Sequence, residues 1–335
     1  MYKIILHLGL PKTATTSLQV NLLMKAHQKD KINFLGRHKS SIYSDYYNPF
    51  GNIISMLYDD YQYFYNFEFI ESSFRLLLKK DLINVISEES LLLSHENKHL
   101  ILIPRVSKLL NQYNCEVLIS LREPMDFLFS YYVELYKWSF FNIEMNNTFQ
   151  KFVNNLLKNS SNSEYDILFY DRILELVSKN FKTIKILLYE DLKISPECYI
   201  RNISDVFSLE YDWTKKLFFI EEQNKKNFNE KGRYSEEITL NQKLNSLVKF
   251  LISSRFGYIF KKLKFLKSYY FILLKVLSKI KIMKAKYHPA LKIEDYNQVK
   301  VLLSKNNSFL TKKYGIQYEK FNSYGYVLND KKVES

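Results

Sequence analysis

Short apolar runs alternate with longer amphipathic stretches through the first two thirds of the chain. Each run is rich in Ile, Leu and Val and short enough for a buried strand; the five runs cover residues 3–8, 31–35, 84–87, 116–121 and 182–188. The stretches between them are long enough for crossover helices. This alternation predicts an α/β fold with a parallel sheet flanked by helices.

The pattern changes towards the C-terminus. Residues 192–217 have helical spacing, residues 223–236 are polar and turn-rich, and apolar residues return at helical spacing from residue 240. Pro289 ends that region, and residues 294–305 predict one more helix. We therefore expect a core over residues 1–237, a basic amphipathic helical insertion over 238–290, and a C-terminal helix and tail over 291–335 that packs on the core.

The positive charge of the chain is concentrated in this insertion. The formal net charge is +14, and residues 238–293 contain 13 Lys and Arg residues and no Asp or Glu. Three interpretations compete: lysines solvated around a packed helical core, amphipathic helices on an anionic membrane surface, or a platform for an acidic glycan or nucleic acid. No nucleic-acid recognition motif accompanies the charge, so nucleic acid fits least. The interleaved aromatic residues favour proximity to a membrane or a glycolipid.

Composition excludes several classes of protein. Apolar residues make up 47% of the chain, enough for a sizeable core and too many for a disordered chain. Two cysteines give no disulfide framework and indicate a reducing compartment, hence the cytoplasm. No Cys and His residues have the spacing of metal ligands, so we expect no metal. The N-terminus lacks the long apolar region of a signal peptide, and no apolar run is long enough to span a membrane.

The first predicted strand runs directly into a candidate anion site, HLGLPKTATTSLQ (residues 7–19). A strand that ends in a turn and a helix start directs several backbone N–H groups at one point. Lys12 adds a mobile charge, and hydroxyl donors follow at Thr13, Thr15, Thr16 and Ser17. The alternative is an ordinary helix start rich in capping residues. Lys12 follows Gly9 by only three positions with no second glycine, which disfavours the loop that binds ATP or GTP.

A second segment, VLISLREPMDFLFSYY (residues 117–132), has the composition of a phosphate site. Arg122 directly follows a buried strand, and Ser130 comes eight residues later on the next helix. Pro124 suits the first turn of that helix, where no N–H donor is needed. The guanidinium fork matches a phosphate, and the serine hydroxyl adds a directional donor.

These two segments resemble, in the right order, the 5′-phosphosulfate loop and the 3′-phosphate motif of sulfotransferases that use 3′-phosphoadenosine 5′-phosphosulfate (PAPS). The resemblance implies a P-loop-type fold in which Lys12 contacts the bridging oxygen of the donor and Arg122 and Ser130 hold its 3′-phosphate. It also implies that the 5′-phosphosulfate lies against the loop residues Thr13, Ala14, Thr15, Thr16 and Ser17. Ala14 stands where many members have glycine; an alanine is suited to a helical position and strained in a left-handed turn. The segment LLYEDL (residues 187–192) and residues 306–316 are also similar to the family.

An acceptor hydroxyl needs a base, and NVISEESLLLSHE (residues 84–96) follows the third predicted strand. It supplies Glu88, Glu89 and His95. Many glycan-directed family members resemble this segment in having a serine–glutamate pair, and Glu89 fits that role best. A positioned carboxylate contributes on the order of 10²–10⁴-fold in rate. The alternative for both glutamates is a helix N-terminus enriched in acid.

We therefore expect a sulfotransferase that moves the sulfuryl group of PAPS to a hydroxyl of a glycan or lipid-linked saccharide. It would act in the cytoplasm, at the inner face of the membrane if the basic insertion binds lipid. One alternative is a nucleotide-dependent, kinase-like enzyme, which would need a Mg²⁺-binding acid at a strand end. Another is a membrane-surface binding protein with a vestigial sulfotransferase fold.

Overall fold

The computed structural model describes residues 2–36, 38–39, 46–93, 97–139, 149–219, 234–239, 281–287, 292–304 and 307–326. The chain divides into two compact units. The larger unit comprises residues 1–127, 161–223 and 303–335, and the smaller unit comprises residues 128–160 and 224–302. The polar network described below lies entirely in the larger unit.

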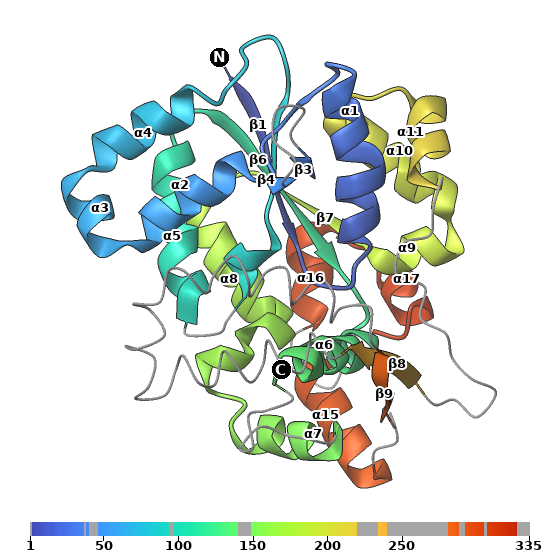
Figure 1. The fold of residues 1–335 in the computed structure, drawn as a ribbon. Coiled ribbons are helices and arrows are strands. Elements are labelled where there is room, and N and C mark those ends of the chain that lie inside the picture. The colour runs from blue at the N-terminus through green and yellow to red at the C-terminus, as the bar shows by residue number, and fades with distance from the viewer. Residues whose placement is uncertain are drawn as a thin grey trace. The chain divides into compact units, whose positions relative to one another are not determined.

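The five predicted strands form one parallel sheet in the larger unit (Figure 1). They are β1 (Lys3–Gly9), β2 (Asn33–Phe34), β5 (Asn84–Ser87), β6 (Asn114–Leu121) and β7 (Ile184–Leu188). Their order is β2-β5-β1-β6-β7, and every pair is parallel. The prediction of a parallel α/β sheet is therefore confirmed. β1 lies at the centre, and its interior residues are completely buried, which explains its continuous apolar run.

Helices cover both faces of this sheet (Figure 1). One face is covered by four elements: the π-helical turn η1 (Ser17–Leu23), α1 (Met24–Gln28), α10 (Pro196–Phe207) and α11 (Tyr211–Phe218). Their apolar side chains pack against Ile5, Val85 and Leu118 of the sheet. The other face carries α2 (Pro49–Tyr58), α5 (Lys98–Leu110) and α8 (Tyr170–Asn180). Together with α9 (Tyr189–Ile194), α10 and α11 confirm the helical prediction for residues 192–217.

Short helices complete the larger unit. They are α3 (Asp60–Tyr65), α4 (Phe67–Arg75), the 3-10 turns η2 (Glu89–Leu92) and η4 (Ser163–Leu168), α16 (Asn307–Tyr314) and α17 (Tyr318–Ser323). Leu310, Phe321 and Tyr326 are completely buried in this C-terminal part. A two-residue antiparallel pairing joins β3 (His38–Lys39) to β4 (Tyr46–Tyr47).

The smaller unit contains most of α6 (Pro124–Ser139), α7 (Phe149–Lys158) and α15 (Ile293–Ser304), so the helix predicted over residues 294–305 is confirmed. The ring of Tyr132 packs against the rings of Phe149 and Phe152, with centroids 5.2 Å and 5.6 Å apart. Gln150 joins α7 to α15 because its amide donates to Asp295 at 2.6 Å.

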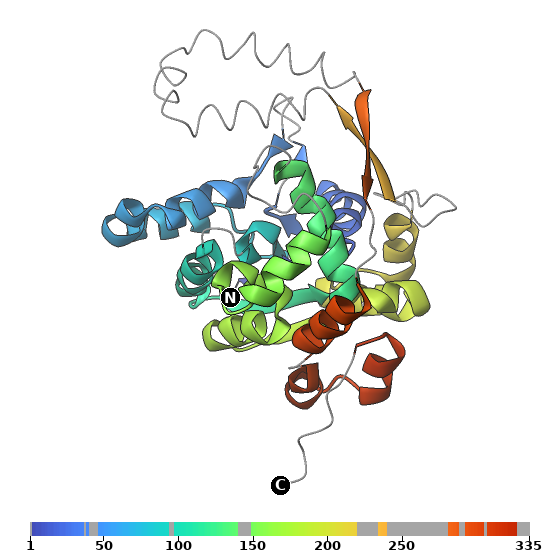
Figure 2. The ribbon, with the colours of Figure 1, turned by 90° about the horizontal axis from the view of Figure 1, so that it is seen from below.

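Part of the sequence interpretation is wrong in this unit. Residues 234–239 form β8 (Tyr234–Thr239), where we expected a loop up to residue 236 and the helical insertion from residue 238. Residues 281–287 form β9 (Lys281–Tyr287) rather than helix. The two strands pair antiparallel and place Glu237 opposite Lys284 (Figure 2). Apolar and charged residues alternate over 283–287, a period of two that suits a strand. Residues 240–280, which carry most of the basic segment, lie outside the described residues.

Candidate active site

The loop after β1 turns through two left-handed residues. Lys12 has a φ of 69° and Ala14 a φ of 63°, and η1 begins as Leu18 N–H donates to the Ala14 carbonyl at 3.0 Å. Alternation between left- and right-handed residues turns successive N–H groups towards one side, which makes a concave anion site. The loop also lies at the carboxyl end of the central strand, where open α/β sheets bind ligands.

Ala14 therefore has the left-handed conformation, which is the strained one of the two considered for this alanine from the sequence. A left-handed alanine costs roughly 1–2 kcal/mol relative to the right-handed conformation. Its methyl group packs against the core cluster between η1 and the sheet, and burial of one methyl group contributes about 0.8 kcal/mol in return. Backbone strain of this kind gathers at ligand-binding sites, where the surrounding structure holds it in place.

Two of the threonines shape the loop itself. The Thr13 hydroxyl donates to the Leu10 carbonyl at 2.7 Å and is buried. Thr15 is also buried and fills the space beside Gly9, where an added Cβ would lie 2.2 Å from the Thr15 methyl carbon. Thr16 and Ser17 are half-buried, and Thr16 makes no side-chain cap to η1. The alternative of an ordinary helix start rich in capping residues therefore finds no side-chain cap at Thr16, the residue that precedes η1.

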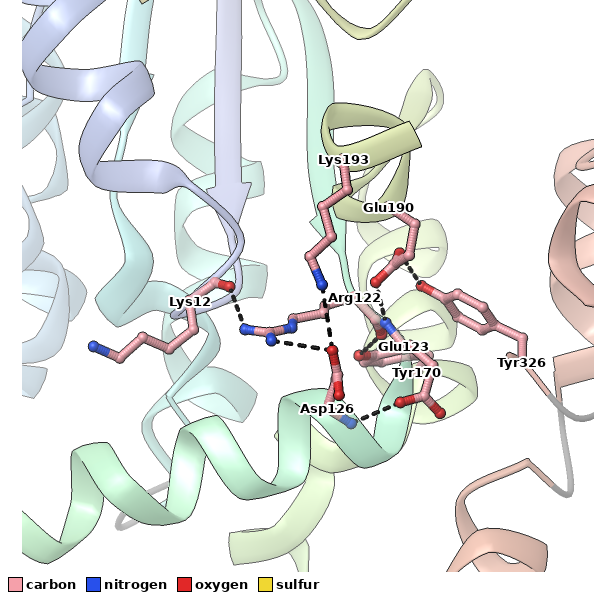
Figure 3. A network of polar contacts seen from close by, with 8 residues as sticks. All are labelled: Lys12, Arg122, Glu123, Asp126, Tyr170, Glu190, Lys193 and Tyr326. Carbon is pink, nitrogen blue, oxygen red and sulfur yellow. Dashed lines mark hydrogen bonds and ion pairs between the residues drawn. The ribbon is translucent and has the colours of Figure 1, made fainter. Parts of the chain in front are cut away.

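Arg122 connects the second motif to this loop (Figure 3). Its Nη1 donates to the carbonyl of Lys12 at 3.2 Å, its Nη2 donates to Asp126 at 3.2 Å, and its guanidinium lies 4.8 Å from the ring centre of Tyr189. Its Nε is buried and has no hydrogen-bond partner within the described part of the chain. A buried guanidinium N–H without a partner is costly, and an anion would satisfy it.

Buried groups fix the backbone at Arg122 from both sides. Tyr170 donates from its hydroxyl to the Arg122 carbonyl at 2.5 Å, and Glu190 accepts from the Glu123 N–H at 2.8 Å. Tyr326 donates to the second oxygen of Glu190 at 3.2 Å. Burial raises the pKa of both Glu123 and Glu190 above the usual range of a carboxyl group. Figure 3 shows these side chains converging on the turn after β6.

The next residue, Asp191, holds the C-terminal segment. It is buried and forms an ion pair with Lys320 at 2.8 Å and accepts from the Tyr324 hydroxyl at 2.6 Å. Three consecutive residues therefore have three separate contacts. The ring of Tyr189 lies against the Arg122 guanidinium, Glu190 holds the turn after Arg122, and Asp191 holds α17. The sequence marked this segment only by its family resemblance and missed the support that it gives.

Ser130, the second residue expected at the 3′-phosphate, is buried on α6. It belongs to the smaller unit, and the two units are not placed relative to each other. Its role stays a prediction.

The candidate bases lie just beyond β5. Glu88 lies near the carboxyl end of β1, because its N–H donates to the His7 carbonyl at 3.2 Å. Its carboxylate caps η2, accepting from the Ser90 hydroxyl at 2.7 Å and the Ser90 N–H at 3.3 Å, and accepts from Asn48 at 3.3 Å. Glu89 is half-buried in the first turn of η2. His95 lies outside the described residues.

A buried histidine beneath the loop was missed by the sequence analysis. His7 is completely buried in β1; its Nδ1 lies 2.7 Å from the Ser87 hydroxyl and its Nε2 lies 3.2 Å from the Ser120 hydroxyl. Gln19 donates to Ser87 at 2.9 Å. Burial lowers the pKa of His7 to about 4, so the ring is neutral at pH 7. The signal in the sequence was His7 itself, a polar residue inside the apolar run of residues 3–8.

Within the described ranges, no three His, Cys, Asp or Glu residues come together as a candidate metal site. No helix of those ranges has the length and apolar character needed to cross a bilayer.

Comparison with known proteins assigns the family. The family profile described as the sulfotransferase domain matches residues 3–249, and the chain belongs to the sulfotransferase family. The resemblance inferred from the two short motifs is thereby confirmed. Members of this family normally use PAPS as the donor. A search of curated proteins gave no match to the sequence.

Three solved structures are similar to the chain, each at 14% identity. A sulfotransferase from Alicyclobacillus acidocaldarius has a TM-score of 0.39, with 77% of this chain and 96% of that chain covered. Mouse sulfotransferase SULT7A1 complexed with PAP has a TM-score of 0.37, with 65% and 64% covered. The sulfotransferase domain from the curacin biosynthetic pathway has a TM-score of 0.36, with 63% and 75% covered.

Proposed function

We propose that the chain transfers the sulfuryl group of PAPS to a hydroxyl group of a glycan or a lipid-linked saccharide. The observation that carries the proposal is the hydrogen bond from Arg122 to the carbonyl of Lys12, which joins the two candidate anion-binding segments. Family membership supports sulfuryl transfer as the reaction.

The residues of this site fit a donor with two separate anionic groups. The loop from Lys12 to Ser17 offers N–H groups and a lysine for a 5′-phosphosulfate. Arg122 offers a guanidinium whose buried Nε has no partner among the described residues, which suits a second phosphate. A nucleotide without a 3′-phosphate would leave that group unsatisfied.

PAPS, when bound, supplies an activated sulfuryl group on a phosphate leaving group. We assign to Lys12 the neutralisation of negative charge on the leaving oxygen, which grows in the transition state. The N–H groups of Thr13, Ala14 and Thr15 are assigned to the phosphosulfate. Because the Thr13 hydroxyl is held by Leu10, side-chain donation is assigned to Thr16 and Ser17.

We assign the transfer of the acceptor's proton to Glu89. The neighbouring Glu88 has a different task, since its two oxygens already hold Asn48 and Ser90 and cap η2. A carboxylate that removes the hydroxyl proton as the sulfur–oxygen bond forms would raise the nucleophilicity of the acceptor.

We base the proposed acceptor class and the proposed location of the protein on the positive charge of residues 238–293. An anionic inner membrane surface would retain a protein with 13 basic and no acidic residues in 238–293, and a lipid-linked saccharide is confined to that surface. The protein would then act in the cytoplasm as a peripheral membrane enzyme. The kinase-like alternative is disfavoured by the family match, and a vestigial binding protein would bind the nucleotide without turnover.

Calorimetric titration with 3′-phosphoadenosine 5′-phosphate (PAP) and with AMP tests the donor. PAP should bind at least about tenfold more tightly, because charge-assisted hydrogen bonds to the 3′-phosphate contribute about 1.5–3 kcal/mol each. Arg122→Ala should remove most of that difference. Equal affinity of the unchanged protein for the two nucleotides contradicts the proposal. Turnover of sulfur-labelled PAPS with a panel of saccharide acceptors identifies the second substrate.

A further inference from the structure

The charged side chains of Arg122, Asp126 and Lys193 meet beside the turn after β6 (Figure 3). The Arg122 guanidinium lies 4.8 Å and the Lys193 ammonium 4.9 Å from the ring centre of Tyr189. Both cations reach the same oxygen of Asp126: Arg122 Nη2 lies 3.2 Å from Oδ2 and Lys193 Nζ lies 3.4 Å from it. One carboxylate therefore faces two cations.

Arg122 and Lys193 share one exposed carboxylate, that of Asp126, as an ion-pair partner. The carboxyl groups of Glu123 and Glu190 also lie nearby, and each accepts a backbone N–H of this turn, Glu123 from Asp126 at 2.6 Å and Glu190 from Glu123 at 2.8 Å. The side chains of Lys193 and Asp126 are 47% and 53% exposed, and ion pairs this exposed stabilise a protein by only about 0–1 kcal/mol. Little stability is lost when such a pair opens, and a phosphate dianion would match the two cations better than the single carboxylate does.

The backbone that carries each of the two cations, Arg122 and Lys193, is held in place by buried side chains. Lys193 lies on α9, whose residues Glu190 and Asp191 are buried and hold Glu123 and Lys320. Arg122 is fixed through its own carbonyl by Tyr170. Asp126 is exposed in the first turn of α6, four residues beyond Arg122, and its side chain can rotate towards solvent. The anion in this group is therefore easier to move than the cations.

We propose that Lys193 is a second specificity-determining cation for the 3′-phosphate and that Asp126 holds the place of that phosphate in the ligand-free protein. This inference rests on the proposed donor. Binding of the nucleotide exchanges the carboxylate for the phosphate between Arg122 and Lys193. Discrimination between PAP and AMP thus depends on a lysine that neither motif contains.

Titrations of the full chain with PAP and with AMP test this exchange. Lys193→Gln should weaken PAP binding about tenfold and change AMP binding by less than about twofold. Asp126→Asn should strengthen PAP binding about threefold or more, because the competing anion is gone, and leave AMP binding nearly unchanged. Lys215 and Glu197 form an equivalent exposed pair at 2.8 Å between α10 and α11. Lys215→Gln and Glu197→Gln make the same charge changes and should leave the ratio of the two affinities at its original value.

Different results overturn different statements. If the unchanged protein prefers PAP and Lys193→Gln keeps that preference, the role of Lys193 is wrong and the donor assignment stands. If Asp126→Asn weakens PAP binding, Asp126 orients Arg122 rather than competing with the phosphate, and the exchange is wrong. If the unchanged protein binds AMP as tightly as PAP, the donor assignment and this inference are both wrong.

Discussion

Arg122 Nη1 lies 3.2 Å from the carbonyl oxygen of Lys12, although 110 residues separate the two positions. The side chain of one candidate anion-binding motif thereby contacts the backbone of the other at its left-handed turn (Figure 3). Both motifs follow neighbouring parallel strands, β1 and β6, whose carboxyl ends meet at one edge of the sheet. Changes at either motif should therefore affect both parts of the proposed donor site.

The close approach of Thr15 to Gly9 predicts that Gly9→Ala destabilises the protein. The new methyl carbon would lie 2.2 Å from the Thr15 methyl carbon and 2.8 Å from His7 Cε1. Overpacking of this kind costs about 1–3 kcal/mol of unfolding free energy, measurable by urea denaturation. Gly9→Ala combined with Thr15→Ser, which removes that methyl group, should recover part of the loss. Additive effects of the two substitutions would show that this contact is not the cause.

Lys12→Ala should lower turnover much more than donor binding. The ammonium charge acts mainly on the leaving oxygen in the transition state, so we expect kcat to fall on the order of 10²–10³-fold and PAP affinity by less than about tenfold. Alanine keeps a Cβ at this left-handed position, so the backbone strain is unchanged. Lys29→Ala, at the exposed end of α1, is the matched control and should leave both quantities unchanged. Near-normal kcat in Lys12→Ala at saturating donor contradicts the assigned role.

Glu89→Gln should separate catalysis from binding. Loss of the base should lower kcat on the order of 10²–10⁴-fold while PAP affinity stays within about twofold of the unchanged protein. Glu88→Gln should instead weaken the cap of η2 and lower the unfolding free energy by about 0.5–2 kcal/mol, with a smaller effect on kcat. The reverse pattern of kcat values would move the base to Glu88.

Buried His7 predicts that the protein loses stability as the pH falls from 6.5 towards 4. The ordinary pKa of 6.5 applies in the unfolded chain, and burial lowers the folded-state pKa to about 4. Between these values the unfolded chain binds a proton that the folded chain does not, so the unfolding free energy falls by about 1.4 kcal/mol per pH unit. Urea denaturation at pH 6.5 and at pH 5 gives the decrease in unfolding free energy between these two pH values. We expect this decrease to be about 2 kcal/mol smaller in His7→Gln than in the unchanged protein. Parallel pH curves for the two proteins would exclude this origin.

The basic segment predicts binding to anionic lipid vesicles. Each Lys or Arg near such a surface contributes about 1 kcal/mol, and salt weakens the attraction within a Debye length of about 8–10 Å. Co-sedimentation should occur with phosphatidylserine vesicles at low salt and be absent with pure phosphatidylcholine. Replacement by glutamine of Lys261, Lys262, Lys264 and Lys267 should reduce binding more than the same change at the control residues Lys79, Lys80, Lys179 and Lys185. Absence of sedimentation at low salt favours lysines solvated around a packed core.

Much of the larger unit could be predicted from local patterns. The five apolar runs gave the five sheet strands, since a strand covered on both faces must be apolar throughout. The two candidate anion motifs were recognisable because each joins a strand end to a helix start over a few residues. The same short segments carried the family resemblance, which the domain match over residues 3–249 confirms.

Only the tertiary structure decided how these pieces meet. Residues far apart in sequence determine the order of the strands, the contact of Arg122 with Lys12, and the hydrogen bond of Tyr326 with Glu190. Local hydrophobic patterns carry no information about such pairs. β8 and β9 were misread because the two strands pair across 41 intervening residues (240–280), a distance that local patterns do not cover. Buried His7 is tolerated in β1 because Ser87 and Ser120 come from the two neighbouring strands. Burial and partnership depend on which strands the fold places side by side, and that is set by the whole chain.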